Sequence, residues 1–402
     1  MTVTIGVMSS APHGSRASGA ATVLRAVLER GPVARSTIAR STGLSPAAVT
    51  RHTADLAAGG FIRQLPQQTA SGGLGRPHLP VDIDLDRHVV AGVHIAVEYS
   101  TLGILDLRGN VLAQESLPHA ANTPQSVLNT AAQRMPGFIR RHSGGRRLLG
   151  IGVASGGWVD SGRGVVVEHA PLAWRDVGVR EVFAQHTRAR VAVDNHARAL
   201  ATAEQLFGQA RTATSAVHLF VGNVVDAAIV TGGAVHRGPG SAAGDIAHQP
   251  LGDPDVRCSC GRRGCLQATV SSAAIAARAA AEGIIAQPSF SALLAAAKAG
   301  EPAALAVFRQ RAEVIGGAVA LLLDVVNPDV LVITEAGALF LPECLATVRD
   351  SVRARSHACV DPARQVLRSS FAATDLLAVA AGTVALDAVY RDPTGAGLEM
   401  AR

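Results

Sequence analysis

The sequence predicts an α/β protein in which a small basic winged helix-turn-helix domain precedes a two-lobed body. Between Ala11 and Pro80 there are eight arginines and only two acidic residues, an excess equal to the formal net charge of +6 of the whole 402-residue chain. The rest of the chain contains the same order of expected strands and helices twice. Apolar residues make up 48% of the chain and charged residues 17%, which indicates large cores and excludes a disordered protein.

Three helices are expected at the basic end of the chain, over residues 19–84. In residues 21–31, ATVLRAVLERG, apolar residues recur at helical spacing and Gly31 ends the run. The segment RSTIARSTG predicts a short second helix, with Ser36 as its N-cap and Gly43 as the turn. The third helix lies in LSPAAVTRHTADLAAGG, where Ser45 is placed to be the N-cap and Pro46 the first helical residue.

The second and third helices, joined by a glycine-containing turn, are typical of a helix-turn-helix that reads the major groove of DNA. The third helix turns Val49 and Leu56 inward, so its other face is available to DNA, with the candidate contacts Ser45, Ala47, Thr50 and Arg51. Arg51 can bond guanine O6 and N7 or a phosphate, and Thr50 can contact a base or the backbone.

A wing is expected after the third helix. FIRQLP and HLPVDID predict two short strands, and Gly75-Arg76-Pro77 near the end of the intervening segment would place Arg76 in the minor groove. The alternative is a three-helix bundle whose arginines are only solvated, or a winged helix that serves dimerisation.

The body is expected to form two lobes, at residues 88–195 and 196–375, with a cleft between them. VVAGVHIAVEYSTLGILDLRGNVLAQE predicts three strands, and a helix and the strand LLGIGVAS follow. AVHLFVGNVVDAAIVTGGAVHRG, a long helix and the strand DVLVIT repeat that order. A helix over 376–392 is expected to complete the first lobe, and residues 1–18 and 393–402 are expected to be tails.

The segment HQPLGDPDVRCSCGRRGC, residues 248–265, holds one histidine and three of the five cysteines. The spacing His-x9-Cys-x-Cys-x4-Cys supplies the four nitrogen and sulfur ligands of a closed, structural zinc site. We therefore predict a structural Zn²⁺ ion held by His248, Cys258, Cys260 and Cys265. With all four positions filled, no catalytic water can bind the metal. The remaining cysteines, Cys344 and Cys359, are expected to be small buried residues.

These features together resemble the ROK family of repressors, uncharacterised reading frames and sugar kinases. The resemblance covers residues 19–395, and its most specific parts are GRP after the wing, GSAAGDIAHQPLG, and CSCGRRGCLQ. It implies lobes of the actin/hexokinase type, the same four zinc ligands, and a homodimer or homotetramer that binds a palindromic operator in double-stranded DNA.

The resemblance also implies a sugar pocket beside the zinc site. The family element GEIGH matches residues 244–248, with Asp245 in place of the Glu and with His248 retained, and Gln267 stands where the family has a Glu. Both changes keep hydrogen-bonding capacity, although the Asp side chain is one methylene shorter. Further implied ligand-binding residues are Gly156 and Gly157 in GVASGGWVD, Asn195, and His196. Residues 165–175 match the segment that closes the pocket, where Trp174 would either stack on the sugar or pack in the core.

The positions that carry kinase chemistry in the family differ here. His196 replaces the catalytic Asp, and because histidine can also act as a base, this change alone does not decide the matter. The first phosphate loop, Asp-x-Gly-x-Thr, reads His94 to Glu98, and the second, Gly-Thr-Gly-x-Gly, reads Gly222 to Asp226. The late glycine pair falls at Glu335-Ala336-Gly337. Loss of the metal-orienting carboxylate and of these glycines predicts a protein that is not a kinase.

The sequence thus predicts a cytoplasmic, sequence-specific transcriptional regulator, a repressor, controlled by a sugar or related metabolite in the cleft. Neither a signal peptide nor an apolar run long enough to span a membrane is recognised in the sequence. The main alternative is an active ATP-dependent sugar kinase fused to a DNA-binding domain. A constitutive DNA binder with a vestigial pocket and an interaction module that does not bind DNA are two further alternatives.

Overall fold

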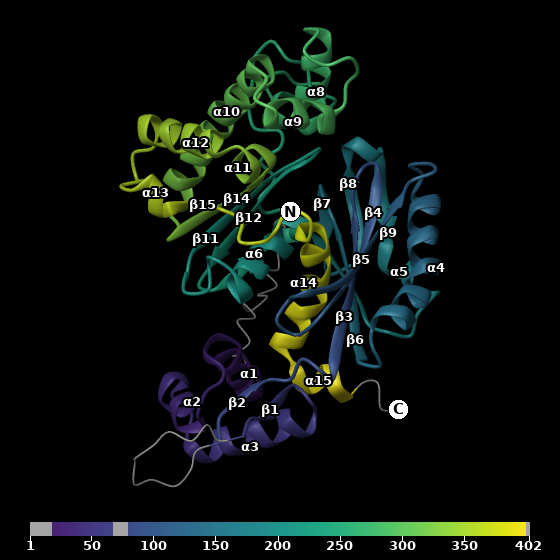
Figure 1. Cartoon of the computed structure of the whole chain (residues 1–402), viewed down its shortest axis with the longest axis vertical. Coiled ribbons are helices and arrows are strands. Elements are labelled where there is room, and N and C mark those ends of the chain that lie inside the picture. The colour runs from purple at the N-terminus through teal and green to yellow at the C-terminus, as the bar shows by residue number, and fades with distance from the viewer. Residues whose placement is uncertain (1–17, 67–78, 399–402) are drawn as a thin grey trace, which may run out of the picture.

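The computed structural model describes residues 18–66 and 79–398 (Figure 1). The predictions for residues 1–17, for most of the wing with Arg76, and for residues 399–402 lie outside the described residues. Within them, the structure confirms the predicted fold class: a helix-turn-helix domain in front of a two-lobed α/β body.

The helix-turn-helix domain contains α1 (Gly19–Arg30), α2 (Arg35–Thr42) and α3 (Pro46–Ala58). Strand β1 (Ile62–Gln64) pairs antiparallel with β2 (Val81–Ile83), as expected for the base of a wing. The Ser45 hydroxyl caps α3 by accepting from the Ala48 N–H at 3.2 Å, and Gly43 adopts a φ of 71° in the turn. The prediction of Ser36 as the N-cap of α2 is wrong, because the cap is Ala34. Val33 pairs with Val81 in a β-bridge, and the helix begins directly after it, at Arg35, so that Ser36 lies inside the first turn.

The first lobe is built on a five-stranded sheet in the order β10-β6-β3-β4-β5. Its strands are β3 (His88–Ile95), β4 (Tyr99–Leu105), β5 (Val111–Pro118), β6 (Arg147–Ser155) and β10 (Val191–Asn195). Helix α4 (Pro124–His142) packs on this sheet, and α5 (Val179–Ala184) packs on α4. A smaller sheet of β7 (Trp158–Asp160), β8 (Val165–His169) and β9 (Trp174–Gly178), with the 3-10 turn η1 (Ala170–Leu172), extends toward the second lobe.

The second lobe repeats this arrangement with the sheet order β13-β12-β11-β14-β15. Its strands are β11 (Ala216–Val221), β12 (Val225–Thr231), β13 (Ala234–His236), β14 (Val330–Glu335) and β15 (Val366–Arg368). Its helices are the 3-10 turn η2 (Pro239–Ser241), α7 (Leu266–Val270), α8 (Ser272–Ala281), α9 (Phe290–Lys298), α10 (Pro302–Val326), α11 (Ala336–Phe340), α12 (Pro342–Arg355) and α13 (Pro362–Gln365). The central strands are β3 in the first sheet and β11 in the second. Each has one antiparallel and one parallel neighbour, as expected for a duplication.

Two helices lie between the lobes: α6 (His196–Phe207) and α14 (Leu376–Arg391) (Figure 1). Helix α14 packs across β3, β4 and β6 of the first sheet and against α6, which itself packs on β11 and β12. Glycines permit this close contact, since a Cβ on Gly152 would lie 2.1 Å from the Ala381 carbonyl oxygen. Because α6 contacts both sheets, the lobe boundaries at 195 and 196 stay a prediction.

The C-terminal segment differs from the prediction. Residues expected to be a tail form α15 (Pro393–Leu398), which contacts α1, α14 and β6. The Asp392 side chain accepts from the Gly395 N–H at 2.9 Å, and Pro393 follows it at a position where a helix needs no N–H donor. At the other end, Ser18 belongs to α1 as its N-cap rather than to a tail.

The helix-turn-helix domain is packed tightly on the first lobe. One continuous apolar cluster includes Leu24 and Val27 of α1 together with Val90 of β3 and Val389 of α14. The Arg25 guanidinium donates to the Gln205 carbonyl of α6 at 2.6 Å, and Arg108 forms an ion pair with Asp82. The domain is therefore joined to the elements around α6 and α14 by a continuous core and by polar contacts.

No single helix among the described residues has both the length and the hydropathy needed to cross a membrane. The adjacent helices α9 and α10 together reach the required length and hydropathy, but the chain bends by 110° between them.

Candidate functional site

The predicted DNA contacts on α3 lie on one exposed face. The exposed residues are Ser45, Ala47, Thr50 and Arg51, while Val49 and Leu56 are buried below them. Arg51 makes no ion pair or hydrogen bond with any described residue, so its guanidinium is available to a partner. The Thr50 hydroxyl donates to the Pro46 carbonyl at 2.9 Å, and the Ser45 hydroxyl is used by the cap. Of the predicted contacts, Arg51 is thus the one whose side-chain polar group makes no hydrogen bond or ion pair within the described residues.

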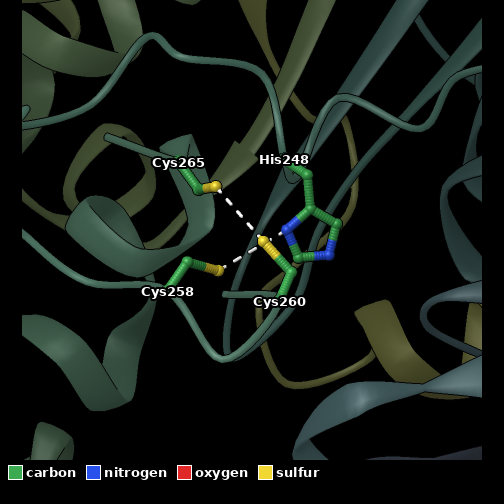
Figure 2. A group of neighbouring side chains, drawn as sticks. All are labelled: His248, Cys258, Cys260 and Cys265. Atoms are coloured by element: carbon green, nitrogen blue, oxygen red, sulfur yellow. Dashed lines mark hydrogen bonds between the residues drawn. The ribbon is translucent and has the colours of Figure 1, made fainter. Parts of the chain in front are cut away.

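The predicted zinc ligands come together. One ligand atom from each of His248, Cys258, Cys260 and Cys265 lies within 4.8 Å of all the others (Figure 2). His248 Nδ1 is 3.5 Å from Cys258 Sγ, and Cys260 Sγ is 3.6 Å from Cys265 Sγ. This set of one imidazole and three thiols, none of them in a disulfide, fits a closed tetrahedral zinc site.

The loop backbone explains why these ligands converge. Gly261 and Gly264 adopt φ angles of 88° and 70°, which turn the chain back between the cysteines. A backbone hydrogen bond from Arg262 is the largest cause that lowers the pKa of Cys260, to about 6. The thiolate that a metal requires is therefore favoured at Cys260, whereas burial raises the pKa of the Cys265 thiol to about 12.

A cavity of about 180 Å³ lies between the lobes beside this cluster. Of the predicted ligand-binding residues, five line it: Gly157, Asn195, Asp245, His248 and Gln267. Because Nδ1 of His248 faces the thiols, the other edge of its imidazole borders the cavity. Gly156 and His196 line a second, larger cavity instead. We call the smaller cavity the interlobe pocket.

Hydrogen bonds fix the walls of the interlobe pocket. The Asn195 side chain donates to the Gly157 carbonyl at 2.8 Å and accepts from the Ala197 N–H at 2.8 Å, so it caps α6 and holds the neighbouring loop. Gln267 accepts from the Val225 N–H at 3.0 Å. Arg198 is buried, and it links the lobes by donating to the carbonyls of Val159 at 2.7 Å and Ser241 at 2.9 Å.

Trp158 is a pocket residue that the sequence analysis did not single out. Its side chain lines the pocket, is 42% exposed, and is held by a 2.8 Å hydrogen bond from Nε1 to the Gly240 carbonyl. The stacking role considered for Trp174 is wrong, because that ring is buried in the first lobe and its Nε1 donates to Asn122. The signal that could have found Trp158 is its place two residues after the predicted pocket glycine Gly156.

Asp226 is a second pocket residue, which the sequence analysis considered only as part of the altered second phosphate loop. Its carboxylate lines the pocket, accepts from the Gly157 N–H at 3.0 Å, and lies 2.9 Å from His196 Nε2. Burial raises the pKa of Asp226, but the contacts from His196 and Gly157 outweigh burial and hold its pKa below the ordinary value. Asp226 therefore lies in the wall of the pocket as an ionised carboxylate.

His196 continues this chain of contacts into the first lobe. Its Nδ1 lies 3.1 Å from Nε2 of His94, and the two buried rings are stacked. Burial, and then the neighbouring His196, hold the pKa of His94 well below the ordinary value, so His94 is uncharged. The two positions for which the resemblance to ROK kinases implies carboxylates are thus occupied by a pair of histidines that contact each other.

The second cavity, of about 800 Å³, lies on the other side of His196. Its walls include His94, Glu98, Phe220 and Asn223, and no arginine or lysine of the described chain lines it. Glu335, from the predicted late glycine pair, is buried, caps α11 through the Ala338 N–H, and forms an ion pair with Arg311 at 2.7 Å. The cavity thus lacks positive charge for phosphate groups.

Residues 90–374 match the ROK family, and residues 20–66 match the IclR helix-turn-helix domain. The chain belongs to the ROK family. It is 34% identical over 393 residues to the transcriptional regulator Rv0485 of Mycobacterium tuberculosis, an alignment that covers 94% of this chain and 87% of that protein. It is 28% identical to the DNA-binding transcriptional dual regulator NagC of Escherichia coli, with 80% and 82% of the two chains covered.

Solved structures share the fold. A ROK family transcriptional regulator described as a homolog of the E. coli MLC protein has a TM-score of 0.75 at 24% identity, covering 92% of this ROK protein and 96% of that chain. A ROK family glucokinase from Streptomyces griseus has a TM-score of 0.63 at 22% identity and covers 73% of this chain. The ROK protein thus has the overall domain arrangement of the family's regulators, whereas the kinase matches a smaller part of it.

Proposed function

We propose that this ROK-family protein is a sequence-specific transcriptional repressor that binds operator DNA and responds to a sugar or related metabolite, without kinase activity. The observation that carries the proposal is the exposed face of α3 on a domain that is packed onto the first lobe of a body with a pocket between its lobes. A DNA-binding face and a small-molecule pocket in one continuous structure are the two sites that a ligand-controlled regulator needs.

The DNA-binding part rests on charge and exposure. Arg51 projects from the helix that enters the major groove in helix-turn-helix proteins, and it has no partner among the described residues. We propose that Arg51 and Thr50 contact bases or phosphates, that Ala47 contacts a thymine methyl group, and that Arg76 reaches the minor groove from the wing. A homodimer or homotetramer would bind a palindromic operator in double-stranded DNA.

The effector part rests on the polar walls of the interlobe pocket. Asp245, Asn195, Gln267 and His248 can hydrogen-bond sugar hydroxyls there. We propose that a structural Zn²⁺ ion on His248 and the three cysteines holds this wall in place. The ion would fold the loop and would supply no catalytic water.

The absence of kinase activity rests on the second cavity. A nucleoside triphosphate needs cations near its phosphates, and this cavity has Glu98 and uncharged His94 in its walls instead. His196 is held between His94 and Asp226 at 3.1 and 2.9 Å and is therefore not placed on the sugar side of the cleft.

Helix α6 provides the physical connection between the two sites. Its N-terminal end carries Asn195 and Arg198 at the pocket, and near its C-terminal end the Gln205 carbonyl accepts a hydrogen bond from Arg25 of α1. A sugar that binds one lobe arrangement better than another would shift α6 and, through Arg25 and the shared core, the position of α3.

The test is selection of genomic fragments by the full chain at near-physiological salt, followed by binding assays on the recovered fragments with a panel of sugars. We expect a few fragments that share an inverted repeat and a sugar that weakens their binding. Recovery without sequence preference, lost as salt rises, would contradict specific recognition. ADP release from ATP in the presence of a sugar would instead establish the kinase alternative.

A further inference from the structure

The interlobe pocket carries an excess of negative charge. Three carboxylates line it, those of Glu168, Asp226 and Asp245, against one guanidinium, that of Arg198. Each nitrogen of Arg198 already donates a hydrogen bond: Nε to Asp194 at 2.6 Å, Nη1 to the Ser241 carbonyl and Nη2 to the Val159 carbonyl. Among the described residues that line the pocket, no lysine or arginine is therefore free to turn toward an anionic group on a ligand.

The zinc site does not change the sign of this charge. A Zn²⁺ ion bound to three thiolates and one neutral imidazole carries a net negative charge, and His248 is the ligand that borders the pocket. On the opposite wall, Glu168 contacts Arg175 at 3.1 Å, but that arginine is 75% exposed and lies outside the pocket lining. Solvent screens such an exposed charge strongly.

The two aspartates face the pocket in different ways. Asp226 is 7% exposed; its Oδ2 accepts from the Gly157 N–H and lies 2.9 Å from His196 Nε2, and the Asn195 side chain is a further contact of the carboxylate. Asp245 is exposed and accepts no hydrogen bond from any described residue. A ligand in the pocket thus meets one buried and one accessible carboxylate, and both groups favour donors over anions.

Trp158 adds an aromatic surface at the same pocket. The hydrogen bond to Gly240 fixes the ring in place while 42% of it stays exposed. An indole ring attracts a cation placed over its face and also packs against the C–H face of a sugar. Carboxylates beside a held tryptophan are thus complementary to a ligand rich in hydroxyl groups or bearing an ammonium group.

We propose that the effector is a sugar that carries no phosphate or carboxylate group, that Asp226 is the residue that excludes anionic forms, and that a free ammonium group on the sugar strengthens binding. The inference rests on the proposed function and adds the class of ligand. The physical reason is that a phosphate brings a charge of about −1.5 to −2 close to carboxylates, with low local screening and without a free cation to offset it.

The experiment is calorimetric titration of the full, zinc-containing chain with matched probes: glucose against glucose 6-phosphate, N-acetylglucosamine against its 6-phosphate, and glucosamine against glucose. We expect each phosphate to bind at least about tenfold more weakly than its parent sugar, and glucosamine to bind more tightly than glucose. A phosphate that binds as tightly as its parent sugar would overturn the inference while leaving the proposed function intact. No binding by any probe would overturn this inference, whereas the proposed function would fail only if no sugar of the panel changed operator binding.

Variants separate charge from shape. Asp226→Asn is expected to reduce the preference for the parent sugar over its phosphate by about tenfold, and Asp245→Asn, which removes no internal hydrogen bond, by a smaller factor. Glu301→Gln, at an exposed site at the start of α10, is the control and should leave the preference unchanged. If Asp226→Asn does not fold, Asp245→Asn decides the matter: an unchanged preference in a folded Asp245→Asn protein would overturn the inference.

Discussion

Single residues decide whether the DNA-binding face and the zinc cluster of this protein act as proposed. At the DNA-binding face, Arg51 is the side chain whose guanidinium has no partner among the described residues, and at the zinc cluster each ligand supplies one of four required contacts. Both sites can be tested by one substitution each, because the side chains of Arg51 and Cys260 are exposed and are not needed for the packing of a core.

Arg51→Ala should weaken operator binding by about 1–3 kcal/mol, because a bidentate contact to guanine or a phosphate contact is lost. The measurement is a titration of the selected operator by the wild type and the variant at one salt concentration. Arg364→Ala, an exposed arginine on α13, should leave the affinity unchanged. Equal operator affinities for wild type and Arg51→Ala would remove this residue from the recognition surface.

Cys260→Ser should lose about one equivalent of zinc per chain, because a serine hydroxyl is a poor ligand beside two thiolates and an imidazole. Elemental analysis measures the metal. Thermal unfolding should show a loss of about 3 kcal/mol where free zinc exceeds its Kd a hundredfold. Cys359→Ser, at a cysteine outside the cluster, should keep its zinc. A full metal content in Cys260→Ser would refute the assignment of this ligand.

Among the elements, α6 joins the sites that a regulator must couple. It begins at Asn195, which is both its N-cap and a pocket residue, and it ends where α1 contacts Gln205. Its length and packing against α14 make it a rigid connection, since nearly the whole helix is buried. A shift of α6 as one body would therefore move the pocket residue Asn195 and the Gln205 contact with α1 together.

Arg25→Ala should reduce the effect of sugar on operator binding by about threefold or more, while sugar affinity stays nearly unchanged. The reason is that the variant loses the 2.6 Å bond from α1 to α6 but alters no pocket residue. Operator titrations with and without the effector measure this coupling. Arg30→Ala, exposed on the same helix, is the matched control. If both variants respond to sugar as the wild type does, α1 receives the signal by another route.

At the scale of the whole molecule, buried histidines make folding depend on pH. Burial lowers the pKa of His169 to about 4 and that of His218 to about 3, from an ordinary value of 6.5. As the pH falls below about 6.5, the unfolded chain takes up protons that the folded chain does not bind, so the free energy of unfolding decreases toward lower pH. Above that pH the effect is absent.

Urea unfolding between pH 7 and pH 5 should therefore show a loss of stability on the order of a few kcal/mol. Because zinc binding also weakens at low pH, the informative quantity is the difference between wild type and His218→Asn, which keeps a polar group near its partner Thr334. The variant should have a shallower dependence on pH. Identical slopes would show that His218 is not held uncharged in the folded protein.

The sequence by itself determined the elements and the zinc motif of this protein. Helical spacing, with Gly43 after α2 and Ser45 before α3, predicts these two helices and the turn between them. The repeated strand order predicts two similar sheets. Both predictions are possible because these signals are local. The spacing of His248 and the cysteines predicts the cluster for the same reason: all four ligands lie within eighteen residues.

Only the tertiary structure decided which side chains share the interlobe pocket. Trp158 and Asp226 are 68 residues apart in the sequence, and His94 is 102 residues from His196, which it contacts. In the sequence, Asp226 could be judged only as a negatively charged replacement of a glycine in a phosphate loop, whereas the fold places its carboxylate in the wall of the interlobe pocket. The same holds for Trp174, whose burial follows from the packing of β9, and for α15, which lies against α1 and β6. Contacts between distant segments depend on how the two lobes and the N-terminal domain pack, and no local pattern records that.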